Sequence, residues 1–153
     1  MAHNDGCLPC ALEDAESETI VLRDDMWSCE IPTGLEAPGW FFLRLRRHAE
    51  GWADLTADEA AAFGAISQRV DAAIRAATGA PKVYFMSFGE NHPHFHFLVV
   101  ARSADLEPTS RGAAIVSRLS ELRDVDASLQ VAAEVRDAIA HTETLSTQHN
   151  RTN

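Results

Sequence analysis

Three histidines alternate along one short segment of the chain. His92, His94 and His96 lie in FGENHPHFHFLVVAR, which runs from Phe88 to Arg102. A neutral imidazole is both a nucleophile and a common metal ligand, and its protonation can be tuned near neutral pH. Neighbouring imidazoles on one face of a strand can therefore divide the roles of metal ligand, nucleophile and phosphate-stabilising donor.

Pro93 limits how many of these histidines share a strand face. Residues two apart in a strand point to the same face, which predicts a common face for His94 and His96. Proline cannot donate to a strand ladder and belongs at the first residues of a strand or on an edge, so His92 lies at or before the bend. The alternative is a polar strand face without a chemical role.

Cys7 and Cys10 form a second candidate group. Their C-x-x-C spacing supplies half of a tetrahedral zinc site. Two more ligands are needed, and His48, at the end of WFFLRLRRH, is a candidate besides the histidine cluster. The alternative is a redox pair, which favours a helix N-terminus directly after a strand, and no strand is predicted before Cys7.

Strands and helices that can position these residues are indicated by the hydrophobic pattern. Thr56 and Glu59 form a predicted capping box, after which apolar residues recur at helical spacing until Gly79 ends the run. Further helices are predicted at 111–122 and 126–140. Strands are predicted at 18–25, 26–32, 40–48, 81–88 and 94–101. The pattern indicates a single α+β domain, residues 1–141, with an antiparallel sheet, and a disordered polar tail at 142–153.

Composition excludes several classes of function. The chain has 153 residues and a formal net charge of -10, which argues against binding a nucleic-acid polymer or an anionic membrane. No segment approaches the roughly 20 apolar residues of a membrane span, and the N-terminus lacks the apolar core of a secretion signal. We therefore expect a cytoplasmic protein.

The histidine segment, together with CLPC near the start and APGWFFLRLRRHAEGWADLTADE, resembles the histidine triad (HIT) superfamily of nucleotide hydrolases and transferases. The resemblance covers roughly Cys7 to Ile139. It implies a sheet of about five antiparallel strands with one long and one C-terminal helix, assembled as a homodimer. It also implies attack of a histidine on the α-phosphorus of a nucleotide, with a nucleotidyl-histidine intermediate. The implied substrates are dinucleoside polyphosphates or nucleoside phosphoramidates.

The superfamily's zinc-binding members imply roles for individual residues here. Zinc would be held by Cys7, Cys10, His48 and the first histidine of the triad. In one register the triad is His92, His94 and His96, and His94 is the nucleophile. In the other, F-G-E-x-x-P-H-φ-H-φ-H-φ-φ-P-R lies over the segment without a gap, which makes His94 the zinc ligand and His96 the nucleophile.

We favour the second register, because Pro93 then falls where the strand begins. Its cost is that Leu98 replaces the third histidine, which helps to bind the transferred phosphate, and leucine cannot donate a hydrogen bond. His92 is a candidate substitute donor. The alternative function is a nucleotide-binding or regulatory module in which this replacement has silenced the chemistry.

Two further candidate site residues are assigned from their positions in the sequence. Glu30 is the candidate for the acidic residue that holds the ribose hydroxyls, and Ser87 is a candidate phosphate-side hydroxyl. The basic run Arg44, Arg46 and Arg47 is interpreted as a solvated strand face rather than a phosphate clamp.

Overall fold

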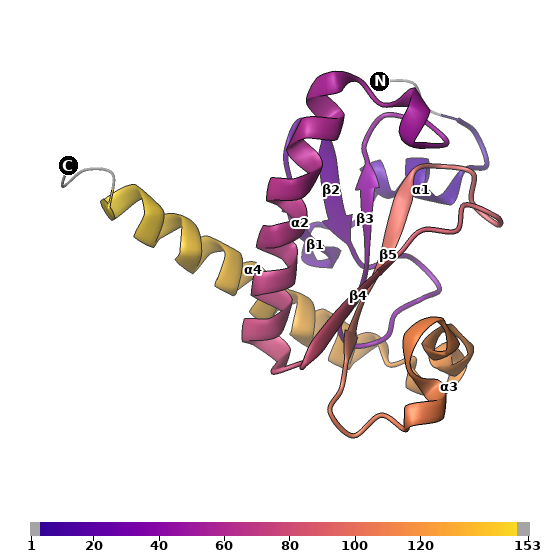
Figure 1. Ribbon diagram of the computed structural model, residues 1–153, viewed down its shortest axis with the longest axis vertical. Coiled ribbons are helices and arrows are strands. Elements are labelled where there is room, and N and C mark those ends of the chain that lie inside the picture. The colour runs from indigo at the N-terminus through magenta and orange to yellow at the C-terminus, as the bar shows by residue number, and fades with distance from the viewer. Residues whose placement is uncertain (1–3, 150–153) are drawn as a thin grey trace.

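The computed structural model describes residues 4–149 and contains one five-stranded antiparallel sheet flanked by helices (Figure 1). The strand order is β1-β2-β3-β5-β4, and every neighbouring pair is antiparallel. This arrangement confirms the predicted α+β class. The strands are β1 (Ile20–Arg23), β2 (Trp27–Glu30), β3 (Trp40–Leu45), β4 (Lys82–Met86) and β5 (His96–Arg102).

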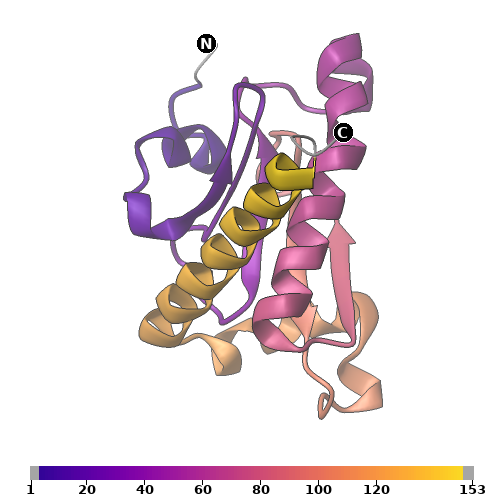
Figure 2. The same ribbon diagram turned by 90° about the vertical axis from the view of Figure 1, so that its left-hand side faces the viewer.

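Two long helices cover one face of the sheet. Figure 2 shows α2 (Ala57–Thr78) and α4 (Val125–His149) side by side across that face. The shorter helices are α1 (Leu8–Ala11) and α3 (Leu119–Leu122). Where a single helix was predicted at 111–122, a 3₁₀ helix, Gly112–Arg118, precedes α3.

The ends of α2 follow the signals in the sequence. Thr56 accepts a hydrogen bond from the Glu59 amide, and the Glu59 carboxylate accepts one from the Thr56 amide. This reciprocal pairing satisfies two donors that a helix N-terminus otherwise leaves free. Gly79 ends the helix with a left-handed φ of 68°, which glycine adopts without a steric penalty.

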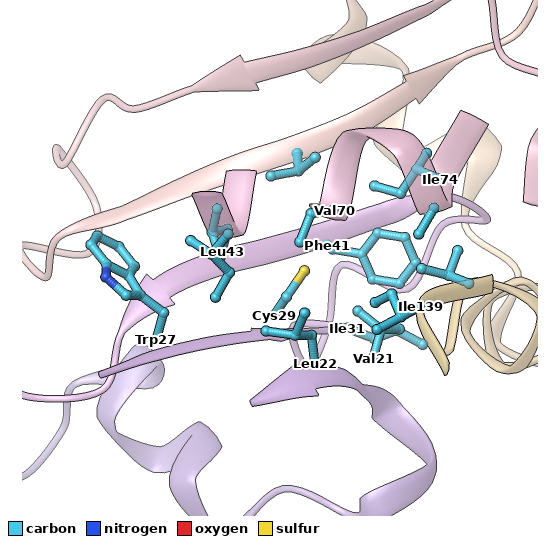
Figure 3. Packing of buried hydrophobic residues seen from close by; sticks show 14 of the residues in the cluster. Val21, Leu22, Trp27, Cys29, Ile31, Phe41, Leu43, Val70, Ile74 and Ile139 are labelled. Carbon is cyan, nitrogen blue, oxygen red and sulfur yellow. The ribbon is translucent and has the colours of Figure 1, made fainter. Parts of the chain in front are cut away.

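Strand alternation gives the sheet two different faces: an apolar face that packs against α2 and α4, and an opposite face, called the site face below. Phe41 and Leu43 of β3 and Cys29 of β2 pack toward Val70 and Ile74 of α2 in the main core (Figure 3). The intervening side chains point to the opposite face, because successive strand residues alternate. The segment around α1 covers one part of this face and the α3 region covers another (Figure 1).

The C-terminal end of the structure differs from the prediction. Helix α4 continues to His149, although a disordered tail was predicted from Thr142. Propagating an existing helix adds one hydrogen bond for each residue fixed, and Arg69 of α2 pairs with Glu143. Residues 150–153 of the predicted tail lie outside the described residues. None of the helices within residues 4–149 combines the length and the apolarity that crossing a membrane requires.

Candidate active site and metal centre

Four predicted metal ligands converge from distant parts of the chain. Cys7 precedes α1, Cys10 lies within it, His48 follows β3, and His94 precedes β5. Their ligand atoms all lie within 4.8 Å of one another. The N-terminal segment is thereby brought against the ends of the two central strands.

The spacing and chemistry of these donors fit a tetrahedral zinc ion. The Cys7 Sγ–His94 Nδ1, Cys10 Sγ–His94 Nδ1 and Cys10 Sγ–His48 Nδ1 distances are 3.5, 3.4 and 3.4 Å. Ordinary Zn–S and Zn–N bond lengths place sulfur and nitrogen about 3.6 Å apart at the corners of a tetrahedron. Two thiolates and two imidazoles also make the ligand set of closed, structural zinc sites.

His94 is oriented for this role by a second contact. Its Nε2 lies 2.7 Å from the carbonyl oxygen of Leu45, so Nε2 carries the proton and Nδ1 faces the cysteines as an acceptor. Burial lowers the pKa of His94 to about 4, which keeps the ring neutral at physiological pH. A neutral imidazole whose distal nitrogen donates to a carbonyl is the usual state of a histidine ligand.

His96 is the first residue of β5, and its ring is fixed by the backbone of His94. Its Nδ1 lies 2.5 Å from the carbonyl oxygen of His94, and Phe42 packs against its ring with the centroids 4.4 Å apart. Burial lowers the pKa of His96, so the neutral ring donates from Nδ1 and keeps an unprotonated Nε2. A fixed tautomer with a free basic nitrogen is what a nucleophilic histidine requires.

A cavity of about 210 Å³ lies against His96 on the site face. His92 reaches it from the loop between β4 and β5, and the centroids of the His92 and His96 rings are 6.3 Å apart. Leu98 also lines it, two residues beyond His96 on the same strand face. The other lining residues are Leu35, Trp40, Phe42, Met86, Phe88, Gly89, Glu90, Asn91, Val116 and Leu119.

Glu30 and Ser87 are not among the residues that line this cavity. Glu30 is fully buried and accepts a hydrogen bond of 2.5 Å from Arg44 Nε. Burial raises the pKa of Glu30 and Arg44 acts in the opposite direction. Ser87 directly follows the last residue of β4 and is exposed.

The basic run is not a solvated strand face. Arg44 is fully buried and pairs with Glu30 and with Glu13, at 3.3 Å. Arg46 also pairs with Glu13, at 3.1 Å, and Arg47 pairs with Glu59 at 2.8 Å. The prediction failed for Arg44 because Glu13, which covers it, lies 31 residues earlier in the chain.

Comparison with solved structures identifies the fold, while sequence comparisons do not. No protein-family model matches the chain, and no curated protein matches it. A Zn-bound histidine triad family protein from Mycobacterium smegmatis superposes with a TM-score of 0.65 and 20% identity, over 92% of this chain and 97% of that one. The chain has the histidine triad fold.

Two enzymes share this fold with the chain. A diadenosine triphosphate hydrolase from Plasmodium falciparum, in complex with Cyclomarin A, superposes with a TM-score of 0.62 and 10% identity, over 82% of this chain and 79% of that one. A uridylyltransferase superposes with a TM-score of 0.63 and 18% identity, over 88% of this chain and 45% of that one. The histidine triad fold therefore accommodates both hydrolysis and group transfer.

Within this fold the start of β5 divides the histidine segment into two parts. β5 begins at His96, so Pro93 and His94 precede the strand, and Phe95 donates from its amide to the Ala49 carbonyl. His94 joins the cysteines, while His96 and Leu98 face the cavity. Apolar lining residues from other elements, such as Val116 and Leu119, were not anticipated as site residues, because nothing in their local pattern separates them from ordinary helix residues.

Proposed function

We propose that the chain is a nucleotide hydrolase or nucleotidyltransferase that acts at the α-phosphorus of its substrate through a nucleotidyl-histidine intermediate on His96. The observation that carries this proposal is the placement of His96 at the wall of the cavity, with Nδ1 held by the His94 carbonyl. The hydrolase and the uridylyltransferase of the same fold support an enzyme of this class.

The reaction follows from the tautomer of His96. Nε2 attacks the phosphorus, the Nε2–P bond forms, and the bond from phosphorus to the leaving group breaks, with its electron pair going to the leaving group. The positive charge that develops on the ring is stabilised because Nδ1–H donates to the His94 carbonyl oxygen. Water or a second acceptor then attacks the phosphorus and restores the free imidazole.

His92 is the residue we propose for contact with the transferred phosphate. Leu98 occupies the strand position of the third histidine and cannot donate. His92 lines the same cavity, and a ring-centroid separation of 6.3 Å from His96 leaves space for a phosphoryl group between the two imidazoles. The loop would thus supply the donor that the strand lacks.

Zinc is the metal we propose for the centre formed by Cys7, Cys10, His48 and His94. With four protein ligands the ion supplies structural stabilisation rather than an open position for substrate. His94 links the two sites, because its ring faces the cysteines while its carbonyl oxygen accepts the hydrogen bond from His96. Loss of the metal ligands should therefore disturb the orientation of His96.

One observation favours a second candidate, a nucleotide-binding module without turnover. Leu98 faces the cavity where phosphate stabilisation is needed, and removal of a single stabilising donor from an active site costs about 10²–10³ in rate. This candidate predicts nucleotide binding without any covalent intermediate.

The test is transfer of label from an α-³²P nucleotide substrate to the protein, measured as acid-labile labelled protein. We expect label on the wild type, none on His96→Ala, and reduced metal content with His94→Ala. His141→Ala removes an exposed histidine of α4 and serves as the matched control. Absence of label on the wild type despite measurable nucleotide binding would select the second candidate.

We also propose a homodimer in the cytoplasm. β4 is an edge strand of the sheet, and its outer backbone groups are available to a second copy of the chain. Three free cysteines, two of them in the metal centre, suit a reducing compartment. Light scattering across a concentration series would give the oligomeric state, and a monomer at all concentrations would rule out the dimer.

A further inference from the structure

We propose that Glu13 is a positioning residue for the metal centre. Three arginines hold its carboxylate against the sheet and thereby keep residues 7–14, called the cysteine segment below, in place before a metal binds. This inference rests on the proposed metal centre and adds to it a residue that is not one of its ligands.

The carboxylate of Glu13 is the point at which arginines from two strands meet. Arg46, directly after β3, contacts both oxygens, with an Nε–Oε1 distance of 3.1 Å and an Nη2–Oε2 distance of 3.2 Å. Arg44 Nη1 lies 3.3 Å from Oε1, and Arg23 Nη1 of β1 lies 3.7 Å from Oε2. Arg23 also donates to the carbonyl oxygens of Leu12 and Glu13, at 2.8 and 3.1 Å. The cysteine segment is therefore attached to the sheet through a side chain and through its backbone.

The charges of this group favour the attached position of the segment. Burial alone would raise the pKa of Glu13, but the hydrogen bond with Arg46 and the charges of the three arginines lower it below its ordinary value. The carboxylate is therefore ionised at neutral pH. Arg44 is fully buried, and Glu13 is one of its two carboxylate partners, so movement of the segment would leave it with Glu30 alone. A network of several charges with short contacts is worth more than an isolated surface pair.

The other attachments of the cysteine segment are few. Within residues 4–149, the remaining hydrogen bonds from this segment to the rest of the chain join its two cysteines to the two histidine ligands. A cavity of about 290 Å³ lies along the segment, and Leu8, Ala11 and Leu12 are among its lining residues. Side chains that border a cavity lose part of their packing contacts. Without a metal, the contacts of Glu13 and Arg23 therefore carry much of the attachment.

This attachment acts on the metal through the positions of the cysteines. The segment carries Cys7 and Cys10, two of the four ligands, while His48 and His94 belong to the sheet side of the site. A binding-competent state that is only partly populated weakens the apparent affinity in proportion. Release of the metal also requires the cysteines to separate from the histidines. Glu13 should therefore increase metal affinity and slow metal release without contacting the metal.

The experiment measures opening of the cysteine segment in metal-free protein by hydrogen exchange, read by mass spectrometry of peptides that cover residues 7–14 and β3. The β3 peptide reports global unfolding, because all of its residues are buried. In parallel, zinc-loaded protein is mixed with excess chelator, and the rate of zinc transfer is followed. The variants are Glu13→Gln and Arg46→Gln. Asp14→Asn removes an equal charge from an exposed neighbour, and Val70→Ala weakens the core on the opposite face of the sheet.

We expect Glu13→Gln to speed exchange of residues 7–14 about tenfold, equivalent to about 1.4 kcal/mol, and to speed zinc transfer by a similar factor. Asp14→Asn should match the wild type in both measurements. Val70→Ala should speed exchange of β3 but leave the cysteine segment and zinc transfer within about twofold. This contrast separates a positioning role from a general loss of stability, which would affect all three measurements with either variant.

Arg46→Gln gives a milder form of the same test, because Arg44 and Arg23 still contact Glu13. It should speed segment exchange and zinc transfer about threefold. The double variant Glu13→Gln/Arg46→Gln should stay within about twofold of Glu13→Gln, since both changes remove the same contact.

Two results would overturn the inference: residues 7–14 of the wild type without protection in the absence of metal, or a Glu13→Gln protein that stays within about twofold of the wild type in segment exchange and zinc transfer. Failure of the proposed metal centre has a different signature, a wild type that binds no zinc. In that case hydrogen exchange of the metal-free protein alone decides whether Glu13 holds the cysteine segment.

Discussion

The buried ion pair between Glu30 and Arg44 allows a test of whether Glu30 stabilises the fold or binds the ribose of a nucleotide. Both side chains are fully buried, and the Arg44 Nε–Glu30 Oε1 distance is 2.5 Å. Arg23 adds a second contact to Glu30 at 3.4 Å. The substitution Glu30→Gln keeps the shape of the side chain and leaves Arg44 with a neutral partner.

The expected loss of stability can be bounded from these contacts. Removing one partner of a buried ion pair costs about 3–5 kcal/mol, because the other charge is left uncompensated. Glu13 still contacts Arg44 at 3.3 Å, so we expect the lower end, about 3 kcal/mol. With a urea m-value of about 2 kcal/mol per M, the unfolding midpoint should fall by about 1.5 M.

The assay is urea unfolding followed by far-ultraviolet circular dichroism, with Glu107→Gln as an exposed control. The double variant Glu30→Leu/Arg44→Met should recover much of the loss, since an apolar pair replaces the ions. An unchanged midpoint for Glu30→Gln, together with a clear loss of nucleotide affinity, would refute this reasoning and return Glu30 to the ribose-binding role.

Three further outcomes are expected. The pKa of Glu59 is lowered to about 2, mainly by its hydrogen bond with Arg47, so its contribution to stability is complete above pH of about 4.5 and is lost as the pH falls through 2. Because Arg47 is partly exposed, this contribution should be about 1–2 kcal/mol, and Glu59→Gln should flatten the acid limb of a stability–pH curve. Elemental analysis of the purified protein should give one zinc per chain. Removal of the metal by a chelator, or the substitution Cys10→Ser, should lower Tm. An unchanged Tm after complete removal of the metal would contradict the structural role of zinc. Gly39→Ala should lower the free energy of unfolding by more than about 2 kcal/mol, measured by chemical unfolding, because its φ is 78° and the new Cβ would lie 2.7 Å from the Ala101 Cβ. Gly79→Ala is the control: its new Cβ meets no such contact, and the substitution should cost about 1 kcal/mol.

Local signals in the sequence predicted the elements that depend on neighbouring residues. The capping box at Thr56 and Glu59 and the glycine at 79 define the ends of α2, and Pro93 marks the start of β5. The C-x-x-C pair led to the metal group because Cys7 is the N-cap of α1 and Cys10 lies within this helix, so the short spacing keeps the two cysteines together. These features are fixed by contacts within a few residues, which a sequence pattern can express.

Features that depend on long-range contacts were not predictable in the same way. Arg44 reads as an exposed strand residue until Glu13 and the segment after α1 are placed over it. Glu30 has the position of a ribose ligand in a linear alignment, but its carboxylate pairs with Arg44, a buried arginine of the neighbouring strand. The apolar lining of the cavity comes from β3, β4, β5 and the α3 region together, and no local pattern marks such a set.

The central claim is that His96, rather than His94 or His92, carries the nucleotidyl group. The most direct measurement is peptide mapping by mass spectrometry of protein quenched during turnover of an α-phosphate-labelled substrate, under conditions that preserve phosphoramidate bonds. The account predicts a nucleotidyl adduct on His96, linked through Nε2. An adduct on His94 would contradict its assignment to the metal centre, and an adduct on His92 would contradict its assignment as the phosphate contact.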